Sequence, residues 1–441
     1  MWISVRLTIP ASTKHPIDAD QGTGGLLLAG AQGNILSVRV WIFGRPTWAT
    51  ALGEGALKSI LLHTGDQCSE LGSHYRRAFA DAVELYVVSA YLTDWDAHIA
   101  LAPSCKRFRF IIGKDFGITR KEACRKVLKW LPAEHMPDFL VADEITGFHP
   151  KAIIWRNAEN QTFMLIGSSN LSRAAFDGNV EANVMLEVSA QVFEEARAWI
   201  DWIEERSVPV GDGWLDRYVE AVRKPGRGAG NRAPLRKKET PVIILKLPRP
   251  PKIAALLRDR RNQLAAYDRR RSGLMQLFRR AADRQINCQQ FFEELPQHWG
   301  HELGNRLQGN GWERMGKQAD FQDLARAFIA ILNAPKRDRD DVVRAELDRL
   351  FACGNLARKA FLSEMLCLRF PKEYPVLNKP VRQFLAKNQV TAPRGSSEGG
   401  RYIDLARKLR SALRSSPGYP AKNLAELDSL IWASSEYNPE A

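Results

Sequence analysis

The sequence lacks the long apolar runs, the paired cysteines and the secretory signal that mark membrane, disulfide-rich and exported proteins. No stretch approaches about 18 consecutive apolar residues, and residues 1–10 show no basic segment followed by an apolar run. The six cysteines contain no CxxC pair, which argues against a disulfide framework and against a thiolate zinc site. We therefore expect a cytoplasmic protein with free thiols and without a membrane span.

Internal repeats are also absent, and the composition is typical of a globular chain. Hydrophobic residues make up 45% and charged residues 26% of the 441 residues, which excludes a disordered or collagen-like chain. This length favours two packed domains over one. Residues 223–240 are rich in Gly, Pro and basic residues without apolar periodicity, as expected of a linker. We expect an uncertain extension at 1–55, a catalytic domain at 56–210, a basic linker at 222–250 and a helical domain at 251–441.

Apolar strands and amphipathic helices alternate through the catalytic domain, and this order predicts an α/β fold. Strands are expected at Ile35–Phe43, Glu84–Thr93, Phe108–Gly113, Asp138–Ala142, Phe148–Trp155, Thr162–Gly167 and Val180–Val188. Helices are expected at Ser69–Ala82, at Arg120–Leu131, from Leu171 and at Gln191–Glu205. In the mainly α-helical C-terminal domain, apolar spacing of three and four residues predicts helices at Ile253–Arg271, Gly273–Ala282, Phe321–Leu332, Asp338–Phe351 and Asn355–Phe370.

The net charge of +14 at pH 7 is concentrated in one segment of the chain. Between Val222 and Arg284 there are 19 Lys or Arg but only four Asp or Glu. Such a block is typical of a surface that binds a polyanion, either nucleic acid or an anionic membrane. A solvated linker and helix face would show the same composition. The candidate nucleic-acid contacts are Arg236, Lys237, Lys238, Arg269, Arg270 and Arg271.

Three short segments carry residues suited to phosphate chemistry. Side chains alternate along a strand, so His149 and Lys151 should share one face of the expected strand Phe148–Trp155. Ser168, Ser169 and Asn170 follow the next strand where a helix should begin, and the amides of a helix start bind anions. Glu181 and Asn183 again share one face of their strand.

Charge and proton chemistry assign a role to each of these residues. Lys151 and Asn170 can neutralise the non-bridging oxygens of a phosphodiester while His149 attacks phosphorus. Glu181 can accept the proton of the other imidazole nitrogen and orient the ring. Ser168 and Ser169 can bind the phosphate. One imidazole cannot both attack and protonate the leaving group, so a second histidine is required.

The order HPK (149–151), GSSN (167–170) and NVE (179–181) resembles the HxK…GSxN…E signature of the phospholipase D superfamily, on the side of its bacterial nucleases and restriction enzymes. The similarity covers about residues 57–205 and implies a mixed sheet flanked by helices. It also implies a phosphohistidine intermediate and an active site built from two such motifs. The other seven histidines do not begin an HxK, so the resemblance implies a homodimer with two half-sites.

Two departures from the family pattern are visible. Arg156 stands where the family has an Asp five residues after the Lys, and the turn between Lys151 and Gly167 is a few residues longer. The tyrosyl-DNA phosphodiesterase branch also lacks that acid. The family's Asp is mainly structural. Its absence therefore weakens the similarity to the family more than it weakens the assigned mechanism.

Together these patterns predict a metal-independent phosphodiesterase without a cofactor, a DNA endonuclease of bacterial defence or restriction. RNA is the alternative nucleic acid, and a protein of a defence system is a candidate partner. Two other functions fit some features of the sequence. A phospholipase acting on anionic lipid would share the catalytic residues, and a non-catalytic nucleic-acid-binding protein would share the fold and the charge.

Overall fold

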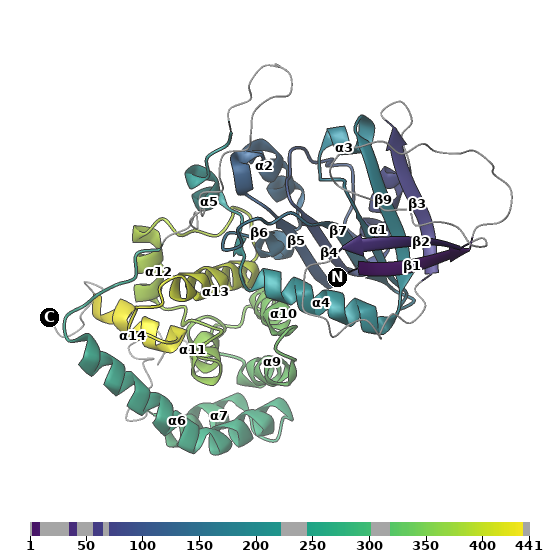
Figure 1. Cartoon of the computed structure of the whole chain (residues 1–441). Helices are drawn as coiled ribbons and strands as arrows, with labels where there is room; N and C mark the ends of the chain where they lie inside the picture. Colours follow the sequence, from purple (N-terminus) through teal and green to yellow (C-terminus); the bar gives the residue numbers. More distant parts are fainter. Residues whose placement is uncertain are drawn as a thin grey trace.

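An eight-stranded mixed sheet dominates the N-terminal region of the computed structural model, which describes residues 2–8, 35–41, 56–64, 70–221, 245–300 and 318–434 (Figure 1). The strands lie in the order β10-β6-β5-β4-β7-β8-β9-β3. Their bounds are β3 (Ala56–Thr64), β4 (Ala82–Ser89), β5 (Arg107–Ile112), β6 (Phe139–Val141), β7 (Lys151–Asn157), β8 (Thr162–Gly167), β9 (Val180–Val188) and β10 (Val208–Pro209). β4, β5 and β6 are parallel, and the other pairs are antiparallel.

Helices cover both faces of this sheet. On one face lie α1 (Leu71–Asp81), α2 (Lys121–Trp130) and α5 (Asp212–Arg217), whose apolar residues share a core with Phe108 and Trp155. On the other face α4 (Ala190–Glu204) packs Phe193 and Ile200 against Tyr86 and Ile154. The central strand β4 is therefore buried on both faces, which explains its nearly continuous apolar sequence.

Shorter elements complete the N-terminal region. They are α3 (Arg173–Asp177) and the 3₁₀ turns η1 (Asp115–Gly117) and η2 (Ala133–Asp138). β1 (Trp2–Thr8) and β2 (Ile35–Trp41) form a separate antiparallel pair within the expected 1–55 extension. The core of the sheet continues past residue 210, because Trp214 and Tyr218 pack within it.

The C-terminal region is helical, as the apolar periodicity predicts. Its helices are α6 (Ile253–Ala282), α7 (Cys288–His298), α9 (Phe321–Asn333), α10 (Arg339–Ala352), α11 (Ala360–Arg369), α12 (Lys379–Lys387), α13 (Glu398–Arg414) and α14 (Leu424–Ser434). Phe278, Phe291, Phe321 and Phe361 lie at the centre of one apolar cluster. Among the helices of the described residues, none is both long and apolar enough to cross a membrane.

A buried network of arginines and carboxylates joins the helical region to the sheet. Arg109 of β5, only 1% exposed, contacts Asp138 at 3.2 Å and Glu204 of α4 at 2.7 Å. Arg407 of α13 contacts the same two carboxylates. Burial alone would raise the pKa of Asp138, but Arg344, Arg109 and the neighbouring His135 hold it well below its ordinary value. Removing one partner of a buried pair costs about 3–5 kcal/mol, so these contacts fix α10 and α13 against β5 and β6.

Several predicted elements differ from the structure, among them the expected strand Glu84–Thr93, which ends at Ser89, and the expected helix Asn355–Phe370, which begins at Ala360. The expected helices Ile253–Arg271 and Gly273–Ala282 form the single helix α6. Gly273 does not break it; a β-carbon there would lie 2.7 Å from Nδ1 of His298, so glycine permits the close approach of α7. The expected strand Phe148–Trp155 instead begins at Lys151, because Pro150 has no N–H to donate to the ladder with β4.

Candidate active site

The predicted catalytic residues gather at one end of the sheet. β8 runs antiparallel to both β7 and β9, so the end of β8 lies beside the starts of its two neighbours. Lys151 begins β7, Asn170 follows β8, and Glu181 lies at the start of β9. The sheet thus brings together groups that are separated by up to about thirty residues in sequence.

His149 and Lys151 are in direct contact, although His149 precedes the strand. Nζ of Lys151 lies 3.0 Å from Nδ1 of His149 and 3.2 Å from its carbonyl oxygen. An ammonium group can only donate, so the imidazole accepts here and has a lone pair. The ring of Tyr91 lies edge-on to the imidazole, with 5.6 Å between the ring centroids. His149 thus lies between the Lys151 ammonium and the ring of Tyr91.

Burial lowers the pKa of Lys151, and the negative charge of Glu181 acts in the opposite direction. The two groups therefore interact electrostatically across the site. A lysine that is partly withdrawn from water interacts more strongly with an anion than a fully solvated one does. This environment suits a residue that neutralises a phosphate.

The side-chain amide of Asn170 is oriented by the loop after β4. Its Oδ1 accepts a hydrogen bond from the backbone N–H of Tyr91 at 3.2 Å. Ser89 Oγ accepts from the N–H of Leu171 at 3.1 Å and donates to the carbonyl of Tyr91 at 2.7 Å. With Oδ1 occupied, the NH₂ end of Asn170 is the end that can donate to an anion.

Ser168 and Ser169 do not lie at a helix start, contrary to the sequence prediction. α3 begins only at Arg173, and its N-cap is Ser172, whose Oγ accepts from the N–H of Ala175 at 3.1 Å. Ser168 Oγ donates to Glu181 and accepts from the N–H of Ala182 at 3.0 Å. The buried Ser169 Oγ accepts from Nδ2 of Asn183 at 2.9 Å. Both hydroxyls therefore tie the end of β8 to β9, and a phosphate-binding role for them stays a prediction.

Glu181 is a buried carboxylate with polar partners. Besides Ser168, it accepts a hydrogen bond from Nδ2 of Asn179 at 3.0 Å. Gly167 allows β8 to approach β9 closely, because a β-carbon there would lie 2.2 Å from Oδ1 of Asn183. The glycine of the GSSN segment thus has a packing reason independent of chemistry.

The position that departs from the family pattern has its own partner. Arg156 of β7 is paired in register with Glu84 of β4 and forms an ion pair with it. Glu84, 2% exposed, also forms an ion pair with Arg197, whose Nε lies 2.8 Å from a carboxylate oxygen. Arg156 is therefore held by a contact within the sheet. This contact lies toward the end of β7, away from Lys151 at its start.

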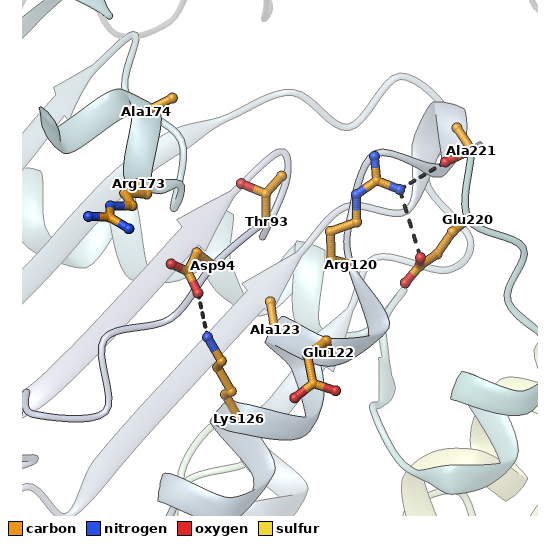
Figure 2. A pocket seen from close by; sticks show the side chains of 10 residues that line it. All are labelled: Thr93, Asp94, Arg120, Glu122, Ala123, Lys126, Arg173, Ala174, Glu220 and Ala221. Atoms are coloured by element: carbon orange, nitrogen blue, oxygen red, sulfur yellow. Dashed lines mark hydrogen bonds and ion pairs between the residues drawn. The ribbon is translucent and has the colours of Figure 1, made fainter. Parts of the chain in front are cut away.

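A cavity of about 920 Å³ opens beside the site (Figure 2). It is lined by Thr93, Asp94, Arg120, Glu122, Ala123, Lys126, Arg173, Ala174, Glu220 and Ala221. Thr93 donates its N–H to the carbonyl of Leu171 at 3.0 Å, so this cavity adjoins the Asn170 loop. The charges of the lining are largely paired: Asp94 binds Lys126 at 2.8 Å, and this hydrogen bond lowers the pKa of Asp94. The size is that of a ligand pocket.

The structure does not bring the basic residues of α6 into this site. Arg269, Arg270 and Arg271 are exposed on α6, which lies at the opposite end of the molecule from α3 and the catalytic end of the sheet (Figure 1). Arg236, Lys237 and Lys238 lie outside the described residues. Among the residues that the structure does describe, no three or more His, Cys, Asp or Glu side chains are grouped as metal ligands.

Sequence reasoning missed Ser89 and Tyr91, which orient Asn170 and flank His149. A usable signal existed, because polar residues at the end of a buried strand often contribute to a site at that sheet edge. The segment VVSAY places Ser89 and Tyr91 directly at the end of β4.

Two solved structures are similar to a portion of this chain. NucT from Helicobacter pylori is 15% identical with a TM-score of 0.27, and the match covers 34% of this chain and 98% of that protein. Nuc from Salmonella typhimurium, a phospholipase D family member, is 16% identical with a TM-score of 0.26, and the match covers 34% of this chain and 97% of that protein. No family model and no curated protein matches the chain. At these TM-scores the likeness carries no weight by itself, so the proposed function depends on the site residues.

Proposed function

We propose that the protein is a metal-independent phosphodiesterase, a DNA endonuclease that acts through a phosphohistidine intermediate as in the phospholipase D superfamily. The observation that carries this proposal is the contact between Lys151 and the imidazole of His149, with Asn170 and Glu181 at the same sheet end. These groups supply a nucleophile, a cation, an amide donor and a carboxylate, which together suffice for attack on a phosphodiester.

The reaction then proceeds in two displacements. A nitrogen of His149 bonds to phosphorus, and the bond from phosphorus to the leaving oxygen breaks as that oxygen takes a proton. Water next attacks the phosphohistidine, gives up its proton, and the phosphorus–nitrogen bond breaks. Lys151 and the NH₂ of Asn170 stabilise the charge on the non-bridging oxygens in both steps. When the phosphate enters, it draws the Lys151 ammonium away from the imidazole. The lone pair of the imidazole nitrogen then becomes free to attack.

The proton donor and acceptor of these steps is the partner subunit's His149, in a homodimer whose two half-sites meet on a two-fold axis. An exposed apolar margin supports a second copy as the occupant of this surface. Ile60, Leu62 and Val180 are 50%, 61% and 82% exposed. They lie on the edge strand β3 and on its neighbour β9, on the face of the sheet opposite to the side chain of Glu181, so the interface we propose would extend around this edge of the sheet.

Nucleic acid is the substrate class that the charge of the chain favours. The basic residues of the linker and of α6 would bind phosphates along a DNA strand, and RNA is the alternative that the same chemistry permits. A role in bacterial defence or restriction, with a partner protein of such a system, follows from the resemblance alone. A lipid substrate would need a surface that enters a membrane, whereas the feature that supports a polyanion here is the excess of basic residues between Val222 and Arg284.

The test is to incubate the purified protein with DNA, RNA and anionic liposomes in the presence of EDTA. We expect cleavage of DNA. His149→Ala should lower the rate by more than about a hundredfold, because deleting a covalent nucleophile typically costs far more than that. His74→Ala, in which a histidine of α1 is removed, is the matched control and should keep wild-type activity.

Other outcomes assign the function differently. Cleavage that vanishes in EDTA and returns with magnesium would place the chemistry on other residues. Release of headgroups from liposomes without DNA cleavage would favour the phospholipase. Tight DNA binding without any cleavage would favour the non-catalytic nucleic-acid-binding protein.

A further inference from the structure

The segment that carries His149 has no regular secondary structure of its own. Residues 142–150 join β6 to β7, and His149 lies next to its end. Gly147, at φ 76°, donates its N–H to Oδ2 of the buried Asp115 at 2.6 Å, and the side chain of Phe148 is buried. The position of His149 therefore depends on side chains from outside the segment.

One of these contacts comes from the helical region of the chain. Arg414 of α13 binds Glu144 with both arms of its guanidinium group, Nε to Oε2 and Nη2 to Oε1, each at 2.8 Å. Ser411, one turn earlier on the same face, donates its hydroxyl to Oε1 of Glu144 at 2.7 Å. Glu144 is thus held by three hydrogen bonds from a helix that is about 270 residues away in sequence. Bidentate arginine–carboxylate pairs are strong and fix direction as well as distance.

α13 is itself fixed at several points along its length. Arg407 donates to the carbonyl of Pro137 at 2.6 Å and binds Glu204 at 2.5 Å. Near the start of the helix Gly399 packs so closely that a β-carbon would lie 2.1 Å from the carbonyl oxygen of Arg344 in α10. A displacement of α13 relative to the sheet would break such contacts. The helix is therefore a rigid support for the segment.

We propose that Arg414 and Ser411 are positioning residues for His149, so that the helical region sets the turnover of a site at the end of the sheet. This inference rests on the proposed function for the role of His149. The coupling is mechanical: α13 holds Glu144, and Glu144 holds the segment that presents the imidazole to Lys151. A shift of the order of 1 Å in a catalytic group can cost about a hundredfold in rate.

The experiment compares two ion pairs that both join the sheet to the helical region. Arg414→Ala removes the contact with Glu144. Arg337→Ala is the matched control, because it removes a 2.5 Å pair with Glu194 of α4 that does not involve the segment. The full-length variants are measured for DNA cleavage, for DNA affinity, for thermal unfolding and for hydrogen–deuterium exchange of the amides of residues 143–149.

For Arg414→Ala we expect kcat to fall at least about tenfold with KM within about twofold, and exchange to rise in residues 143–149. Arg337→Ala should leave kcat and the exchange of residues 143–149 unchanged. The charge-reversed double variant Glu144→Arg with Arg414→Glu should recover some of the lost kcat. Equal losses in Arg414→Ala and Arg337→Ala, or wild-type kcat in a folded Arg414→Ala protein, would overturn the proposal.

The exchange measurement separates this proposal from the proposed function. If the wild-type protein cleaves nothing, the proposed function fails, while exchange still reports whether Arg414 holds the segment. Unaltered exchange of residues 143–149 in Arg414→Ala overturns the positioning role whatever the activity.

Discussion

Lys151 is the residue whose environment most directly links structure to chemistry. It contacts the imidazole of His149, and its pKa is lowered by burial while Glu181 raises it. The ammonium is present below that lowered pKa and is lost as the pH rises through it. Binding of a phosphate needs the charged form, so cleavage should decline on the alkaline side earlier than an ordinary lysine would allow.

Removing the charge of Glu181 should move this alkaline decline in cleavage to lower pH. In Glu181→Gln the opposing contribution disappears, so the pKa of Lys151 should fall and the ammonium should lose its proton at lower pH. The measurement is an NMR titration of protein with labelled lysine, in which Lys151→Arg identifies the signal. Lys126, whose pKa is raised by its hydrogen bond to Asp94, is the internal control and should titrate unchanged. An unmoved Lys151 signal would show that Glu181 does not act on the lysine.

The residues of the site also show what could be predicted from the sequence and what could not. Alternation along the strands predicted the faces of Lys151 and Glu181, whereas Asn170 was expected at a helix start that the structure places later, at Arg173. His149 reached the site by another route, because Pro150 ends the ladder and leaves the histidine on a loop. The sequence contains that proline, so the shorter strand was predictable. The contact of Glu144 with Arg414 was not, because no local pattern relates residues about 270 positions apart.

At the scale of elements, some strands with regular apolar patterns were predicted within a residue or two, whereas the strand expected at Glu84–Thr93 ends at Ser89. β8 and β9 have the expected bounds Thr162–Gly167 and Val180–Val188. α6 differed because a serine and a glycine in mid-helix resemble a break, whereas packing against α7 decides the outcome. Tertiary contact overrides local propensity at such positions. Sequence composition is limited in a similar way for charge, because it does not say which face of a charged helix or strand contacts a partner.

The exposed arginines of α6 can be tested together. If Arg269, Arg270 and Arg271 bind phosphates, replacing all three by Gln should weaken DNA binding and flatten the slope of log affinity against log salt by about two to three units. The triple variant Arg236→Gln, Lys237→Gln and Lys238→Gln measures the linker in the same way. Arg76→Gln with Arg77→Gln on α1 removes exposed charge elsewhere and serves as control. Unchanged slopes in both triple variants would identify the basic block as solvated surface.

At the scale of the whole molecule, the buried arginine network couples the sheet and the helical region into a single mechanical unit. Arg109 and Arg407 contact the same carboxylates, Asp138 and Glu204, from the two regions of the chain. We propose a division into a catalytic domain and a helical domain on the expected bounds, with an interface that does not open freely. A DNA molecule that reached from α6 to the catalytic end of the sheet would have to follow the length of this unit (Figure 1).

The proposed homodimer makes a quantitative prediction about mixed subunits. A reaction that needs a nucleophile on one side of phosphorus and a proton donor on the other requires both imidazoles of the pair. Wild-type and His149→Ala chains that exchange freely should therefore show activity that follows the square of the wild-type fraction, about a quarter in an equal mixture relative to the undiluted wild type. Subunit exchange is followed by fluorescence energy transfer between labelled chains, and activity is measured on the same samples.

His74→Ala chains provide the control mixture, in which activity should stay constant at every ratio because the site is untouched. A dependence that is linear in the wild-type fraction would mean that each chain completes its own site.

The exposed apolar margin of β3 and β9 gives a second test of the homodimer. Leu62→Glu places a charge on this apolar surface beside β9. If this margin meets a second copy, the variant should sediment as a monomer and lose cleavage together with dimerisation, whereas a fully active monomer would require the second proton-transfer group to lie within the same chain.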